Sequence, residues 1–328
     1  VFAGSTSALG LIAGRALIGL GVSSCLMAAF KAYSIWVSRE RLPLINGFHM
    51  AVGGLGALSG TVPVEAALSY TDWRGVFLFL GSLTVLASAV IFIIVPKRNE
   101  SEIKETSGGM KSQLNGVITV FTSPMFWWVA PFTVASQAAF LATQSLWAGP
   151  WLHDVGGLER DQVASHLLLV AASMVAGFAS SGVITDRLRR FGIKPLSIAV
   201  AGISIFIIVQ CLITFRLVDA ALPLWMMFGF FGTTGILPYA ALSQKFPLHL
   251  SGRVTTGLNL LVFVSAFATQ WATGAIIGLW PKTAVGGYDP AGYQAAFGVI
   301  IGFQVLGLLW LIVFGKGRRE FAIAQQDI

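Results

Sequence analysis

Apolar runs recur along the whole chain, separated by short stretches that contain charged residues, Pro or Gly. Each run has about 20 residues, the length that an α-helix needs to cross roughly 30 Å of hydrocarbon. The pattern predicts nine complete membrane spans, at residues 10–32, 45–68, 74–95, 126–150, 163–185, 195–215, 221–242, 255–279 and 295–315. The predicted fold class is therefore all-α, in the form of a polytopic membrane protein.

The first residues of the chain have the same apolar character. Val1, Phe2, Ala3 and Gly4 predict the end of a further helix, and the sequence shows no initiator Met and no signal peptide. We therefore expect the chain to be a fragment of a longer protein, and inactive by itself.

The composition argues against a soluble domain. Hydrophobic residues make up 55% of the 328 residues and charged residues only 11%, and the mean hydropathy is +0.79. Soluble domains contain about 25% charged residues. Cys25 and Cys211 both lie inside predicted spans, where we expect small buried side chains without a disulfide or a metal.

The net charge of +7 is distributed unevenly between the loops. Lys and Arg resist transfer across a membrane and stay on its cytoplasmic side. One set of alternate loops carries Lys31, Arg39, Arg41, Lys97, Arg98, Lys104, Lys111, Arg187, Arg189, Arg190, Lys194, Lys245, Arg253, Lys316, Arg318 and Arg319, whereas the other carries only Arg74, Arg160, Arg216 and Lys282. The carboxyl terminus is therefore predicted to be cytoplasmic, in a plasma membrane or bacterial inner membrane. The basic charge does not require nucleic acid as a partner.

The longest polar stretch separates three predicted spans from six. We predict three parts: residues 1–95 as the remainder of an N-terminal bundle, 96–120 as a cytoplasmic linker, and 121–328 as a six-helix C-terminal bundle with a short cytoplasmic tail. A weak internal repeat supports this division, because Trp73-Arg-Gly-Val-Phe77 resembles Tyr293-Gln-Ala-Ala-Phe297. If the halves are copies, the first lacks its initial two to three helices.

The most specific motif lies between the fifth and sixth predicted spans, in a segment expected to be a cytoplasmic turn. It reads Gly182-Val-Ile-Thr-Asp186-Arg187-Leu-Arg189-Arg190. This segment resembles the signature loop of the major facilitator superfamily, Gly-x-x-x-Asp-Arg-x-Gly-Arg-Arg, with Arg189 in place of the usual Gly. A carboxylate beside several Arg residues can pair with a neighbouring helix in one conformation and release it in another. The resemblance implies a conformational latch of Gly182, Asp186, Arg187 and Arg190, unless these Arg residues only follow the cytoplasmic charge bias.

A second resemblance concerns the first complete span. Gly14-Arg15-Ala-Leu-Ile-Gly19-Leu-Gly21 looks like the Arg-x-x-x-Gly-x-Gly pattern of the family's fourth helix. A cation inside a span costs about 2 to 3 kcal/mol unless it faces water or a partner. Arg15 is therefore expected to face the passage and contact an anionic solute or a coupling carboxylate, unless it snorkels to the outer interface.

The exporters of this family usually carry Gly-x-x-x-Gly-Pro-x-x-Gly-Gly in the fifth helix. The corresponding segment here is Gly56-Ala-Leu-Ser-Gly60-Thr-Val-Pro63-Val-Glu65, in which Pro is displaced and Glu65 replaces the final Gly. The difference argues against drug–proton antiport. Glu65 is a candidate for proton coupling, unless it lies at the outer interface beside Asp72.

Polar side chains in the second half follow helical spacing. An amide that faces lipid is costly, so these side chains should point into a cavity or bond to another helix. The candidate substrate-binding residues are Arg15, Gln137, Gln144, Trp147, His166, Asn259, Phe263 and Gln270.

The sequence contains no phosphate-binding loop and no His-Glu-x-x-His motif, so we expect no cofactor, metal or nucleotide. The predicted function is secondary active transport of a small solute by a monomer, through proton-coupled symport or uniport; the partners are the solute, the lipid bilayer and protons or another coupling ion. Drug or metabolite efflux by antiport is the alternative. From another class, the rival is a membrane-embedded enzyme for lipid-linked substrates, for which only Asp72, Asp154, Glu159 and Asp161 approach the required acids.

Overall fold

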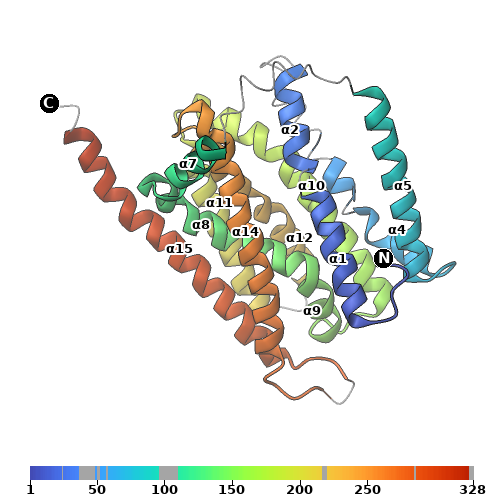
Figure 1. Ribbon diagram of the computed structural model, residues 1–328. Coiled ribbons are helices and arrows are strands. Elements are labelled where there is room, and N and C mark those ends of the chain that lie inside the picture. The colour runs from blue at the N-terminus through green and yellow to red at the C-terminus, as the bar shows by residue number, and fades with distance from the viewer. Residues whose placement is uncertain are drawn as a thin grey trace. The chain divides into compact units, whose positions relative to one another are not determined.

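The computed structural model describes residues 1–23, 25–36, 49, 52–56, 58–95, 110–215, 220–283 and 286–324. All regular elements in these ranges are helices, which confirms the all-α prediction (Figure 1). The chain divides into two compact units, Val1–Ser107 and Gly108–Ile328. The division falls inside the predicted linker, although α7 (Met110–Phe121) shows that the end of this linker is helical.

The described part of unit 1 includes α1 (Ala8–Val22), α2 (Cys25–Trp36), α4 (Val62–Leu68) and α5 (Trp73–Ile94), and residues 52–56 and 58–59 are also helical. The first predicted span, 10–32, includes the end of α1 at Val22 and the start of α2 at Cys25, and the Ser23 hydroxyl donates to the carbonyl oxygen of Leu20. The second predicted span, 45–68, lies partly outside the described residues, and its described part contains a turn at Gly60 and Thr61 before α4 begins.

Unit 2 begins with α7 and continues with an interrupted helix of three parts, α8 (Pro124–Ala142), η1 (Thr143–Trp147) and α9 (Ala148–Asp154). Two long helices follow, α10 (Arg160–Arg190) and α11 (Pro195–Thr214). A second interrupted helix consists of α12 (Ala221–Gly232), η3 (Thr233–Ile236) and α13 (Leu237–Ser243). The last helices are α14 (Leu248–Ile277) and α15 (Pro290–Ala324).

Seven helical stretches are long and apolar enough to cross a membrane within the described ranges. They correspond to the third through ninth predicted spans, and lie at Trp73–Ile94, Pro124–Asp154, Arg160–Thr185, Pro195–Thr214, Ala221–Ser243, Leu250–Ile277 and Pro290–Gly315. The length and hydropathy of the apolar runs were sufficient to predict these seven helices, because an apolar run of about 20 residues with few charges is typical of a membrane span.

Local sequence signals set several helix ends. Asp72 caps α5 by accepting the N–H of Gly75, and Ser123 caps α8 ahead of Pro124. The helix α10 ends just before Gly192, whose φ of 81° is in the left-handed region. The backbone N–H of Ile193 then donates to the carbonyl oxygen of Leu188 at 3.2 Å, which caps the end of the helix.

The repeated aromatic pairs of the sequence also have matching geometry. The rings of Trp73 and Phe77, at the start of α5, lie 6.3 Å apart and nearly perpendicular. Those of Tyr293 and Phe297, near the start of α15, lie 6.1 Å apart in the same edge-to-face manner. Each pair joins residues one helical turn apart.

The core of unit 2 is built mainly from aliphatic and Phe side chains of α8, α11 and α14, with contributions from α7, α13 and α15. Beside it, α11 and α15 are connected by a reciprocal pair of amides, which we call the glutamine pair. Gln210 Nε2 donates to Gln304 Oε1 at 3.0 Å, and Gln304 Nε2 donates to Gln210 Oε1 at 3.2 Å. Both side chains are buried, so each satisfies the other inside the bundle.

Candidate functional site

A polar contact joins the irregular segment η1 to α14. Residues Thr143–Trp147 form one π-helical turn, a feature that is frequent at functional sites. The side-chain amide of Gln270 donates to Ser145 Oγ at 2.8 Å, and Trp147 Nε1 donates to the carbonyl oxygen of Gln270 at 3.2 Å. The structure thus brings together two predicted residues, Trp147 and Gln270, and adds Ser145. We call these three residues the η1 joint.

A second polar contact lies at the other irregular segment. Gln137 of α8 donates its amide N–H to the carbonyl oxygen of Gly232 at 3.2 Å, at the start of the 3-10 turn η3. The approach is so close that a Cβ at Gly235 would collide with the Gln137 amide. Both interrupted helices therefore meet a Gln side chain of a neighbouring span at the point where regular α-helix stops.

The remaining predicted residues of unit 2 have other contacts. The hydroxyl of Tyr239 in α13 lies 3.5 Å from Asn259 Oδ1 in α14. Gln144 is half-buried within η1, and His166 Nδ1 lies 2.8 Å from a backbone carbonyl oxygen one turn earlier in α10. Phe263 exposes 58% of its surface on α14. The hydrogen bonds of the η1 joint include neither His166 nor Phe263, and the binding roles of all four stay predictions.

Asp154 organises a cluster that sequence analysis did not predict. Its side chain is only 7% exposed, and its Oδ2 accepts the Tyr293 hydroxyl at 2.7 Å and the Tyr288 backbone N–H at 3.1 Å. Its Oδ1 lies 2.9 Å from His153 Nδ1. The rings of Tyr288 and Tyr293 each lie 6.3 Å from the Trp147 ring. The cluster therefore connects the end of α9 and the segment before α15 to the η1 joint.

Arg15, in unit 1, lies against two aromatic rings. Its guanidinium carbon is 5.0 Å from the ring centroid of Phe2 and 5.6 Å from that of Phe77, within the range of cation–π attraction. The side chain is exposed within this unit. Glu65 is half-buried in the first turn of α4. The recognition role of Arg15 and the coupling role of Glu65 stay predictions.

The latch motif requires a correction of its secondary structure. We expected a turn, but α10 continues through the motif to Arg190, because the sequence signal that ends the helix comes only afterwards. Gly182, Arg187 and Arg190 are exposed on the last turns of α10. The side chain of Asp186 lies outside the described part of the structure. Helical spacing places positions 182, 186 and 190 on one face, and the latch itself stays a prediction.

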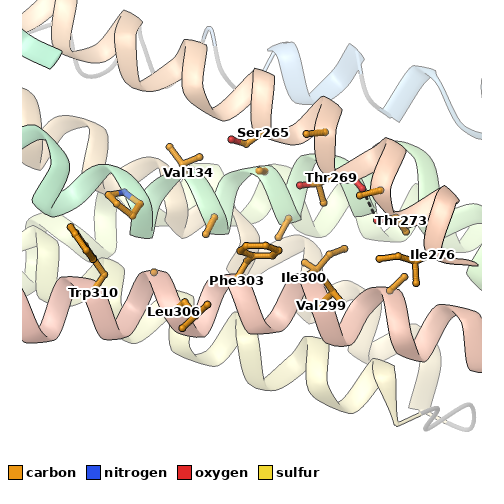
Figure 2. A pocket seen from close by; sticks show the side chains of 18 residues that line it. Val134, Ser265, Thr269, Thr273, Ile276, Val299, Ile300, Phe303, Leu306 and Trp310 are labelled. Carbon is orange, nitrogen blue, oxygen red and sulfur yellow. Dashed lines mark hydrogen bonds between the residues drawn. The ribbon is translucent and has the colours of Figure 1, made fainter.

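An apolar groove lies elsewhere in unit 2, away from the predicted polar residues. Its walls are α14 between Ser265 and Ile276 and α15 between Ala296 and Trp310, and α8 between Pro131 and Ala139 lies behind them (Figure 2). Its volume is about 580 Å³, within the usual range of ligand pockets. We call it the lateral groove. None of the candidate binding residues lines it.

Comparison with known families assigns the chain to a class. Residues 1–270 match the Major Facilitator Superfamily, and the chain belongs to this superfamily. It is therefore an integral membrane protein of a transporter family, and the rival assignment to a membrane-embedded enzyme does not fit.

Two similar proteins are fungal. The MFS-type transporter opaD of Aspergillus ustus is 31% identical over 110 residues, which cover 34% of this chain and 18% of that protein. The MFS-type transporter calB of Penicillium decumbens is 32% identical over 93 residues, which cover 27% of this chain and 16% of that protein. The matched regions thus span less than a fifth of the length of either relative.

Proposed function

We propose that the protein carries a small solute across the membrane by alternating access, as a symporter or uniporter. The main observation behind this proposal is that two membrane spans depart from α-helical geometry, and each receives a polar contact from a neighbouring helix at that point. Backbone that departs from α-helix inside a membrane is tolerated where it is buried in protein or lines a cavity, and discontinuous helices form the binding sites of many transporters. Both η1 and η3 have this character.

The exposure of the η1 joint supports a position on a passage. Ser145 is exposed and Gln270 is half-buried within unit 2, although both belong to long apolar spans. A hydroxyl and an amide at this depth are costly to leave in lipid. We infer that this side of α14 faces the solute pathway, where the Ser145–Gln270 bond opens when the solute binds.

The remaining predicted roles belong to the same proposal. Arg15 attracts an anionic group of the solute, and its aromatic neighbours hold the guanidinium in place. Glu65 carries the coupling proton, and the α10 motif of Gly182, Asp186, Arg187 and Arg190 acts as the latch. The protein works as a monomer in the plasma membrane with its carboxyl terminus in the cytoplasm.

Uptake into proteoliposomes tests the proposal. Radiolabelled organic and inorganic anions are offered with and without an inward proton gradient. We expect Gln270→Leu to lower the flux about tenfold, because one polar contact of about 1.4 kcal/mol is lost in the conducting cycle. The control is Ile208→Leu, at a position of α11 that is 58% exposed, which should retain the flux.

Two results would count against the proposal. Equal flux in the Gln270→Leu and Ile208→Leu proteins would remove the η1 joint from the mechanism. Unchanged flux in an Arg15→Gln protein would remove Arg15 from anion recognition, while loss of uptake with retained binding would assign Arg15 to coupling.

A further inference from the structure

The lateral groove has the chemistry of a site for hydrocarbon. Its lining contains no charged side chain, and its polar side-chain groups are the hydroxyls of Ser265, Thr269 and Thr273 along α14 and the indole N–H of Trp310, which donates to the carbonyl oxygen of Trp127 at 2.8 Å. The Thr273 hydroxyl donates to the carbonyl oxygen of Thr269 at 2.7 Å, so it is satisfied by its own helix. A polar or ionic solute would find few partners there and would lose its hydration.

Small residues create the depth of the groove. Ala138 and Ala139 of α8 form its base and are almost fully buried, whereas Ala268 and Ala272 of α14 line one wall. Across from them, Phe303 of α15 projects into the space between the two helices (Figure 2). The short side chains on one side leave room that the other described residues of unit 2 do not fill.

The rim of the groove is apolar and exposed within unit 2. On the α15 rim, Phe303 is 65% exposed and Leu306 is 62% exposed. On α14, Ala268 at the rim is exposed as well. Large apolar side chains on the outside of membrane spans contact lipid, and Phe303 and Leu306 are side chains of this kind.

The dimensions suit one chain of a lipid. The wall from Ser265 to Ile276 is about 17 Å long and the wall from Ala296 to Trp310 about 21 Å, at 1.5 Å per helical residue. The hydrocarbon of one leaflet is about 15 Å deep, half of the roughly 30 Å of a bilayer. The groove runs along the helices, as an acyl chain does in the membrane.

We propose that the lateral groove holds an acyl chain of a bilayer lipid as a bound component of the protein. An empty groove would forfeit dispersion contacts along its whole lining, and water gains few hydrogen bonds there. The bilayer supplies chains of the right chemistry at the opening. This site is separate from the proposed solute pathway, because none of the residues of the η1 joint lines it.

Photocrosslinking in lipid nanodiscs tests the proposal. The protein is reconstituted with a phosphatidylcholine that carries a diazirine in the middle of one acyl chain, irradiated, digested and analysed by peptide mass spectrometry. We expect adducts to concentrate on the walls at Ser265–Ile276 and Ala296–Trp310. The comparison surface is the exposed apolar face of α10, which includes Leu169 and Val183.

Variants that fill the groove make the test specific. Ala268→Phe adds a ring at the exposed rim, and Ala272→Leu fills the wall one turn further along. Each should lower the groove adducts to the level of the α10 face. Ala176→Phe, at an exposed position on α10, is the matched control and should leave the adducts in place. Size-exclusion elution and thermal unfolding establish that each variant is folded.

Three outcomes would overturn the proposal: uniform labelling of the α10 face and the groove, groove adducts that persist in both filled variants, or crosslinks from the groove to another polypeptide segment in place of the lipid. The last result would identify a helix as the occupant. Because the readout is a lipid adduct, its failure would leave the solute transport proposal untouched.

Discussion

The glutamine pair allows the attachment of α15 to α11 to be measured. Replacing Gln304 by Leu removes both reciprocal hydrogen bonds and leaves the buried amide of Gln210 without its partner. Hydrogen bonds between membrane helices contribute about 0.6 kcal/mol each on average, and a buried polar group left unsatisfied costs about 1 to 3 kcal/mol. We therefore expect Gln304→Leu to destabilise the protein by about 2 kcal/mol, with a similar loss for Gln210→Leu.

The double variant makes this prediction specific. With both amides replaced by Leu, no unsatisfied group remains, so the loss should be about 1 kcal/mol instead of the sum of the single losses. Reversible unfolding in mixed micelles, titrated with SDS and followed by circular dichroism, gives the four free energies of the cycle. Val305→Leu, at the next position of α15, is the control and should show no coupling to Gln210. Additive losses for the glutamine pair, within about 0.3 kcal/mol, would refute this reasoning.

Three further predictions concern single positions of unit 2. Gly232→Ala should destabilise by about 1 to 3 kcal/mol, because the new methyl group collides with the Phe140 ring; a melting temperature equal to that of the unmodified protein would contradict this. Tyr293→Phe should cost about 1.5 to 3 kcal/mol by removing a hydrogen bond to the Asp154 carboxylate, and hydrogen exchange near residue 288 should increase. Gly192→Ala should cost about 1 kcal/mol in the same unfolding assay, because its φ of 81° disfavours a Cβ, and an unchanged stability would count against the helix-ending role.

The membrane spans of the second half followed from the sequence because their signal is local and strong. Long apolar runs such as 195–215 and 221–242 agree with the observed helices to within a few residues. The first predicted span covers two described helices, α1 and α2, and a hydropathy pattern does not locate the boundary between them. The hydropathy pattern also did not predict the interruptions η1 and η3, because the apolar runs continue through both segments.

The candidate site was predicted in part. Helical spacing identified polar side chains on α8 and α14, and the structure connects several of them across helices, as in Gln270 with Ser145 and Gln137 with Gly232. The partners were not predictable, because they lie far apart in sequence and depend on which helices pack together. From the sequence, Asp154 was identified only as an acid near a membrane edge. Its place in a hydrogen-bonded cluster became evident from the structure, in which the Tyr293 hydroxyl donates to Asp154 Oδ2 at 2.7 Å.

Two-sided accessibility of Ser145 tests the central claim, that the η1 joint lies on an alternating passage, without knowledge of the solute. In a protein with Cys25→Ala and Cys211→Ala, Ser145→Cys is treated with a membrane-impermeant maleimide in right-side-out and in inside-out vesicles. Ile208→Cys, at an exposed apolar position of α11, is the control. The account predicts labelling of Ser145→Cys from both sides of the membrane and of Ile208→Cys from neither. Labelling of Ser145→Cys from one side only, or from neither, would contradict alternating access at this site.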